Sequence, residues 1–138
     1  MKRSVDARTG LEIIPPDECR RLLATDQVGR LAVNDGGTPM VFPVNYALDG
    51  EAIVIRTATG TKLDSAGRTA CFEVDAFDRA TRHGWSVVVS GLLEEAGVHA
   101  TGELARMQLL DLSPWADGER SHWLRLVPSR ITGRRVGD

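Results

Sequence analysis

Residues 40–57 read MVFPVNYALDGEAIVIRT, and this stretch decides the fold. Its centre, Asp49-Gly50, is the sharpest turn signal in the chain, because an Asp-Gly pair between apolar runs is typical of a tight β-hairpin. The pattern predicts a strand over residues 40–48 that returns as an antiparallel strand over residues 51–57. Pro43 lies inside the first strand, and proline cannot donate a hydrogen bond to a ladder. We therefore expect this strand to lie at a sheet edge or to be bulged there.

The segments around this hairpin indicate a protein built mainly from strands. Further strands are predicted at residues 28–34, 70–75, 86–93 and 123–135, the last of them either continuous or broken at Pro128. Short helices are predicted at residues 15–25, 62–66 and 101–112. Since the strands follow one another without long helices between them, we expect a mainly β fold, a six-stranded antiparallel barrel with peripheral helices. Residues 1–10 are expected to be a flexible N-terminus, and residues 11–138 a single domain.

The bulk composition excludes several classes of protein. The chain has 138 residues, enough for one domain with a buried core, and a net charge of −2, which argues against a dedicated nucleic-acid binder. No apolar run approaches the roughly 20 residues that cross a bilayer, and no apolar stretch follows the charged start of the chain, so we expect a cytoplasmic protein without a membrane partner. Cys19 and Cys71 are far apart and form no Cys-x-x-Cys pair, which favours two reduced thiols.

A small polar loop follows the second strand of the hairpin and carries Arg56, Thr57, Thr61 and Lys62. Lys62 is one of only two lysines among 17 basic residues. Hydroxyls and backbone N–H groups supply directed hydrogen bonds to a phosphate, and lysine and arginine supply charge. The loop therefore indicates an anion site, and a solvated hairpin end is the alternative interpretation.

The sequence carries no signature of a metal centre or of a nucleophilic enzyme. The histidines His83, His99 and His122 are far apart and have no acid cluster beside them, so no metal site is expected. No Gly-x-Ser-x-Gly motif is present, and no Gly-x-Gly-x-x-Gly run opens a helix, which excludes a dinucleotide fold of that type. Glu73 and Asp75 alternate on one face of a strand, which favours a salt-bridged rim over a general acid/base couple.

Two further segments contribute to the functional hypothesis. Trp85 stands at the start of a predicted strand. It either packs against the end of the barrel or lies against the planar ring of a ligand, and the second alternative is open because a large flat side chain stacks well on an aromatic ligand. The C-terminus is locally basic, with Arg120, Arg125, Arg130, Arg134 and Arg135. This basic run is either a solvated face or the completion of the anion site from a neighbouring subunit.

Several short pieces of the chain occur in a consistent order that is typical of one family. They are Val28-Gly29-Arg30-Leu31-Ala32, Pro43-Val44-Asn45-Tyr46, Arg56-Thr57 with Gly60-Thr61-Lys62-Leu63, Phe72-Glu73-Val74-Asp75, Gly84-Trp85-Ser86-Val87 with Gly91, and the tail Ile131-Thr132-Gly133-Arg134. With this order and spacing, residues 11–135 resemble the pyridoxamine 5'-phosphate oxidase-like family of flavin-binding split barrels.

The resemblance implies a six-stranded split barrel of the FMN-binding type and a homodimer that holds two FMN molecules between its subunits. The loop residues would hold the flavin phosphate, and residues 43–46 would line the isoalloxazine ring. Ser86 stands where the family's oxidases place a ring-contacting glutamine, with Trp85 beside it, and Arg134 falls near a tail position that reaches the cofactor from the partner chain. The cofactor-binding residues implied are Pro43, Val44, Asn45, Tyr46, Arg56, Thr57, Thr61, Lys62, Trp85, Ser86 and Arg134.

One departure from the family argues against one of its activities, the oxidation of vitamin B6. The true oxidases end in an Arg-Leu-His-Asp-Arg type of tail that grips substrate phosphate, whereas residues 134–138 contain no histidine, so oxidation of vitamin B6 is not expected. The resemblance implies a flavin-dependent oxidoreductase acting on a small molecule, and no catalytic side chain is assigned, because hydride transfer to a flavin requires none. Two alternatives stay open: a reductase using the deazaflavin coenzyme F420 in the same groove, and a non-enzymatic flavin or haem sensor.

Overall fold

The computed structural model of the protein describes residues 4–97, 102–116 and 118–137. The predicted hairpin is confirmed at its turn, where β5 (Ala47–Asp49) pairs antiparallel with β6 (Ala52–Thr57). Gly50 takes a φ of 61°, in the left-handed region that glycine adopts without a steric penalty. The strand predicted at residues 40–48 is divided into β4 (Thr38–Asn45) and β5, because β4 pairs with β3 (Val28–Asp35) while β5 pairs with β6.

The position of Pro43 agrees with the prediction of an edge strand. β4 is the last strand of the sheet order β1-β2-β9-β8-β7-β3-β4, so it has a ladder neighbour on one side only, within the described residues. Pro43 pairs with Arg30 of β3, and its missing N–H leaves no gap in an interior ladder.

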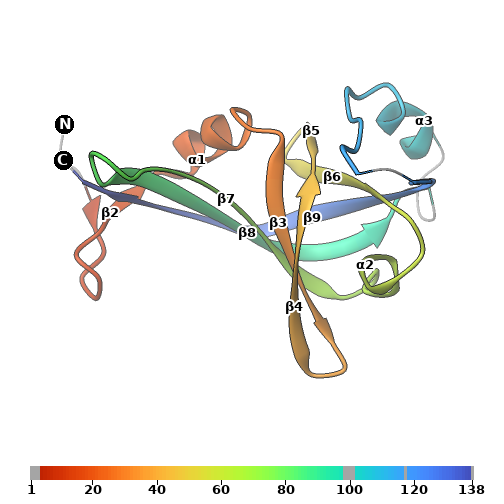
Figure 1. The fold of residues 1–138 in the computed structure, drawn as a ribbon, viewed down its shortest axis with the longest axis horizontal. Coiled ribbons are helices and arrows are strands. Elements are labelled where there is room, and N and C mark those ends of the chain that lie inside the picture. Colours follow the sequence, from red (N-terminus) through yellow and green to blue (C-terminus); the bar gives the residue numbers. More distant parts are fainter. Residues whose placement is uncertain (1–3, 98–101, 117, 138) are drawn as a thin grey trace.

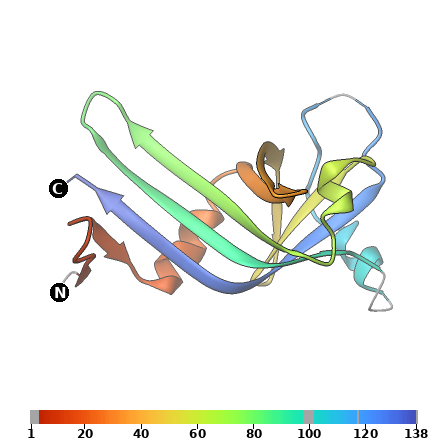
Figure 2. The same ribbon diagram turned by 90° about the horizontal axis from the view of Figure 1, so that it is seen from below.

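Three long antiparallel strands form the body of the molecule. They are β7 (Thr69–Asp78), β8 (His83–Glu95) and β9 (His122–Val136). Pro128 does not break β9, because a register shift opposite Ser90 and Gly91 absorbs it. Figure 2 shows the long strands bending as they cross the molecule, which gives the sheet the curvature of an open barrel. The fold is mainly β and antiparallel, as predicted.

Within residues 1–10, predicted as a flexible N-terminus, the structure describes residues 4–10. Ser4–Val5 form β1, which pairs with β2 (Glu12–Ile14), and β2 in turn pairs with Gly133, Arg134 and Arg135 at the end of β9. Residues 1–3 lie outside the described range. These two short strands, with the division of residues 40–48, raise the number of strands from the six predicted to nine in the part of the chain that the structure describes.

In the described residues, three short helices lie around the sheet. They are α1 (Pro16–Leu23), α2 (Thr61–Asp64) and α3 (Glu103–Met107). The first confirms the prediction at residues 15–25, with proline in its first turn. The third is shorter than the predicted helix 101–112, whose first residue lies outside the described range. No helix in the described part of the chain is both long and apolar enough to span a bilayer.

The main core lies inside the curve of the sheet and centres on Phe72, which is fully buried. The ring of Tyr46 meets it edge-on, with centroids 4.8 Å apart. Gly29 must lack a side chain, since a Cβ there would stand 2.2 Å from the ring of Phe72. A second, smaller core includes Met107 and Trp123 and anchors α3 to the outer side of β6 and β9.

Candidate functional site

Arg56 lies at the end of β6, where it pairs with Trp123 of β9. Its guanidinium carbon is 5.0 Å from the centroid of the Trp123 ring, a cation–π contact. The Nε and Nη1 atoms donate to the backbone carbonyls of Arg120 and Leu112, at 3.3 and 3.2 Å. The guanidinium of Arg56 is therefore held by a cation–π contact with Trp123 and by two hydrogen bonds to the segment that follows α3.

Lys62 is the second residue of α2. Its Nζ is 4.6 Å from the centroid of the Phe42 ring on β4. Burial, followed by the positive charge of Arg120, lowers the pKa of Lys62. The ammonium is thus placed between the edge strand β4 and a second cation from a distant loop.

A cavity of about 70 Å³ brings these residues together. Its lining includes Pro43, Val44 and Asn45 of β4, Arg56 and Lys62, and also Pro114, Ala116 and Arg120. Five of the predicted cofactor-binding residues therefore face a single space. Asn45 is fixed there, because its Oδ1 accepts a 2.8 Å hydrogen bond from the backbone N–H of Trp115 and its Nδ2 donates to the carbonyl of Gln27 at 3.3 Å.

Three predicted residues have other positions. Tyr46 is buried in the core, and its hydroxyl donates to the carbonyl of Leu23. The side chain of Thr57 is also buried, and its hydroxyl donates to the carbonyl of Ala58 at 3.1 Å. Thr61 is the first residue of α2 and is half-buried. The side chains of Tyr46 and Thr57 are thus buried and hydrogen-bonded to backbone carbonyls of their own chain.

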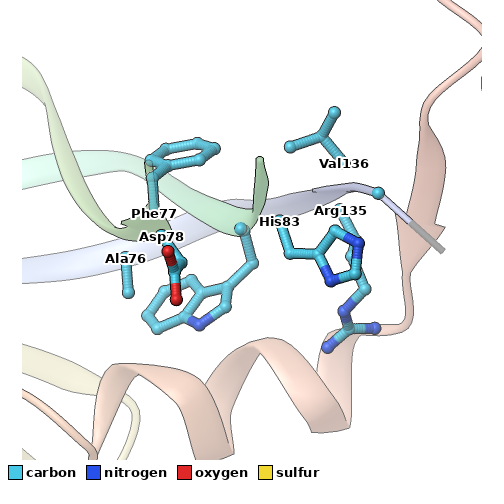
Figure 3. Close-up of a pocket in the computed structure, with 9 residues that line it drawn as sticks. Ala76, Phe77, Asp78, His83, Arg135 and Val136 are labelled. Carbon is cyan, nitrogen blue, oxygen red and sulfur yellow. The ribbon is translucent and has the colours of Figure 1, made fainter. Parts of the chain in front are cut away.

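The remaining predicted residues lie elsewhere on the sheet. Ser86 of β8 pairs with Arg134 of β9, and Arg134 forms a 3.1 Å ion pair with Asp6. Trp85 lines a cavity of about 540 Å³ at the tips of β7, β8 and β9. Figure 3 shows His83 and Arg135 beside each other in this cavity.

The two groups of predicted residues are far apart within one chain. Trp123, beside Arg56, and Arg135, beside Trp85, are separated by twelve positions on β9. At roughly 3.3 Å per residue this is about 40 Å along the strand. Figure 1 places α2 and α3 at one end of the longest axis and the tips of β7, β8 and β9 at the other. Within a single chain the two groups of predicted residues therefore lie at opposite ends of the sheet.

The predicted salt-bridged rim is confirmed on the outer face of β3 and β7. Arg30 Nη1 lies 3.3 Å from Glu73 Oε1 and 3.7 Å from Asp75 Oδ2. Burial raises the pKa of Glu73 to about 7, helped by the hydrogen bond and negative charge of Asp75 and opposed by Arg30.

The described residues contain no group of three metal-binding side chains. Of the histidines, His122 is 2.9 Å from Glu95 through its Nδ1, and His83 lies at the tip of β8. His99 lies outside the described residues.

Arg120 is the residue at this site that sequence reasoning missed. It follows a loop with no repeating pattern, and it is 58 positions from Lys62 in the chain. In the sequence, Arg120 stood out only as a member of the basic C-terminal run. That run was interpreted either as a solvated face or as part of the anion site of a neighbouring subunit, so it did not predict that Arg120 lies beside Lys62 of its own chain.

Comparison with known proteins identifies the family. The family model for pyridoxamine 5'-phosphate oxidase matches residues 15–135, and the chain belongs to this family. An uncharacterised protein of Mycobacterium tuberculosis is 33% identical over 127 residues, which cover 87% of this chain and 82% of the relative.

Two solved structures have the same fold. An FAD-binding protein from Mycobacterium smegmatis is 33% identical, with a TM-score of 0.76 over 91% of this chain and 99% of its own. An FAD-binding protein from Mesorhizobium loti is 25% identical, with a TM-score of 0.74 over 93% of this chain and 98% of its own.

Proposed function

We propose that this protein binds a flavin, with the phosphate end of the cofactor at Arg56 and Lys62. The observation that carries the proposal is the cavity in which these two cations meet residues 43–45 of the edge strand. Cations and a free strand edge suit a phosphate joined to a flat ring that hydrogen-bonds to backbone groups. The FAD-binding names of two relatives support the same class of ligand.

We propose further that the working form is a homodimer with the cofactor at the subunit interface. Trp85, Ser86 and Arg134 lie at the far end of the sheet from Lys62, so they reach the same cofactor only if a second copy supplies them. This arrangement accounts for both groups of predicted residues with one site.

The activity proposed is that of an oxidoreductase acting on a small-molecule substrate. A bound flavin supplies the hydride or electron transfer, and the protein supplies binding and orientation. In this chain Asn45 is a candidate for orienting the ring, because two hydrogen bonds already hold its amide. FMN is the cofactor predicted from the sequence, and FAD is supported by the names of the relatives. Coenzyme F420 and a non-enzymatic flavin or haem sensor remain the alternatives.

The first experiment is an absorbance spectrum of the purified protein before and after addition of a flavin and desalting. We expect flavin bands that stay with the wild-type protein and are lost from Lys62→Ala. Lys62 contacts Phe42 at its tip, so its truncation leaves the core intact. Arg130→Ala is the matched control. Arg130 is an exposed cation on β9, and it does not line the cavity that contains Arg56 and Lys62. A wild-type protein that retains no flavin refutes the proposal.

The dimer is tested separately by light scattering on the same sample. The chain has a mass of 15.0 kDa, and the proposal predicts a particle of twice that mass. A monomer that binds flavin normally would reject the shared site and leave flavin binding in place.

A further inference from the structure

The ends of β7, β8 and β9 form a cavity of about 540 Å³ at the opposite end of the sheet from Lys62 (Figure 1). This volume is within the range typical of small-molecule sites, roughly 300 to 1,000 Å³. The lining consists of residues 76–78, 83–85 and 135–137. The cavity is therefore built by one chain from strand ends that the cation site does not use.

The cavity has a wall on the face of the sheet that is turned toward α1. The register places Ala76, Trp85 and Arg135 side by side in one row. Arg135 forms a 2.8 Å ion pair with α1, so this row lies on the helix side. Because successive side chains of a strand point to opposite faces, the next row points away from the helix. Figure 3 shows Phe77 and Val136 of that row on the other side of the strands.

Trp85 gives this wall a flat aromatic surface. Its indole is half-buried and packs against the main core, which fixes its position. Its cross-strand neighbour Ala76 has only a methyl group, and both residues line the cavity. An indole held in this way favours a planar ring, because aromatic rings stack with a gain beyond the area they bury.

His83 is the polar group of the cavity that has no partner. It is exposed, and in the described part of the chain its imidazole takes part in no hydrogen bond or ion pair. A Cβ at Gly137 would stand 2.2 Å from the imidazole, so the glycine lets the ring lie against the backbone there. A neutral imidazole offers one donor and one acceptor to a ligand.

The two charged side chains of the cavity already have partners. Arg135 lies 2.8 Å from Glu18 and 3.7 Å from Glu12. The carboxylate of Asp78 accepts hydrogen bonds from two backbone N–H groups of the turn between β7 and β8, at 2.8 and 3.2 Å. A charged ligand would give up its hydration without gaining an unpaired opposite charge, so the lining favours an uncharged one.

We propose that this cavity binds a flat, uncharged aromatic compound, with its ring against Trp85 and one hydrogen-bonding group on His83. The inference rests on the proposed function in one respect. In the proposed homodimer the second copy brings Trp85 to the cofactor, so the compound bound beside it is the substrate. Binding itself requires neither the flavin nor a second copy, because every lining residue belongs to one chain.

The test is a fluorescence titration of the purified protein with N-phenyl-1-naphthylamine, an uncharged dye that brightens in apolar sites. The bound dye is then displaced with 2-naphthol, naphthalene and 2-naphthalenesulfonate, which share a ring system and carry a hydroxyl, no polar group and a negative charge. We expect 2-naphthol to displace the dye at a concentration about three to ten times lower than naphthalene, the usual effect of one hydrogen bond. The sulfonate should be the weakest of the three.

Two variants separate the ring contact from the hydrogen bond. Trp85→Ala should weaken dye binding about tenfold. Trp115→Ala is the matched control, since Trp115 is 70% exposed and does not line this cavity. His83→Phe should bind the dye but lose the preference for 2-naphthol over naphthalene. It also decides the question if Trp85→Ala does not fold, because His83 is exposed.

The inference is overturned if 2-naphthol and naphthalene displace the dye equally from the wild-type protein, or if Trp85→Ala and Trp115→Ala lose binding equally. A loss in Phe77→Ala as large as that in Trp85→Ala overturns the placement of the ring on the α1 side. A protein that retains flavin but binds no dye rejects this inference alone. A protein that binds the dye as described but retains no flavin supports the cavity and rejects only the proposed function.

Discussion

The carboxyl of Glu73 should make the protein less stable as the pH rises from about 5 to 8. In the folded protein its pKa is about 7, against an ordinary value of 4.5, so between these values the folded state binds more protons than the unfolded state. Stability falls with pH wherever the folded state holds the extra proton. The stabilisation is therefore fully present below about pH 4.5 and is lost as the pH rises through 7.

The size of the effect follows from the shift and the exposure of the side chain. A shift of this size corresponds to about 3 kcal/mol at 1.36 kcal/mol per pKa unit. The Glu73 side chain is 29% exposed and Arg30 is nearby, so solvent screening reduces this to about 1–2 kcal/mol. The other groups facing it are Asp75 on the same strand and the uncharged Val88 opposite on β8.

Glu73→Gln isolates the effect, because glutamine keeps the shape and does not titrate. We expect urea unfolding to show that the variant gains about 1–2 kcal/mol relative to wild type between pH 5 and pH 8. Thr69→Ser, at an exposed and non-titrating position of the same strand, should show a difference that does not change with pH. A Glu73→Gln difference that is the same at both pH values refutes the reasoning about desolvation of this carboxyl.

Three further predictions concern the packing and hydrogen bonding of buried parts of the fold. Tyr46→Phe should lower the free energy of unfolding by about 1–3 kcal/mol in a urea titration, because it leaves the buried carbonyl of Leu23 without its donor; an unchanged midpoint would contradict this. Gly91→Ala should destabilise the protein by about 3 kcal/mol or more or prevent folding, since the added Cβ would stand 1.9 Å from the carbonyl oxygen of Val127. A variant that melts at the wild-type temperature would show that the backbone at this register shift can move to accept a Cβ. Cys19 should resist a thiol reagent until the protein is denatured, because it is fully buried and burial raises the pKa of its thiol; mass spectrometry that finds it labelled in the native state would contradict this.

Local signals account for the parts of the fold that the sequence predicted well. The turn at Asp49-Gly50, the β-branched run of β8 and the proline at the start of α1 each set the backbone of a few adjacent residues. The edge position of β4 follows from Pro43 for the same reason, because a missing N–H limits pairing whatever the rest of the chain does. The order of the short motifs was enough to identify the family that the comparison confirms.

Long-range pairing accounts for what the sequence did not predict. β1 and β2 are short and mostly not buried, and they form strands because the end of β9 offers them a ladder. Pro128 signals a break, but the register shift opposite Gly91 lets β9 continue. Neither outcome depends on the propensity of the residues involved.

The sequence by itself determined the class of fold, the edge strand and the presence of a cationic loop at Arg56 and Lys62. Only the tertiary structure decided that Arg120 joins that loop, that Tyr46 belongs to the core, and that Trp85 lies at the opposite end of the sheet. The physical reason is that neighbours across antiparallel strands are set by register, which one bulge can change, whereas turns and propensities act over only a few residues.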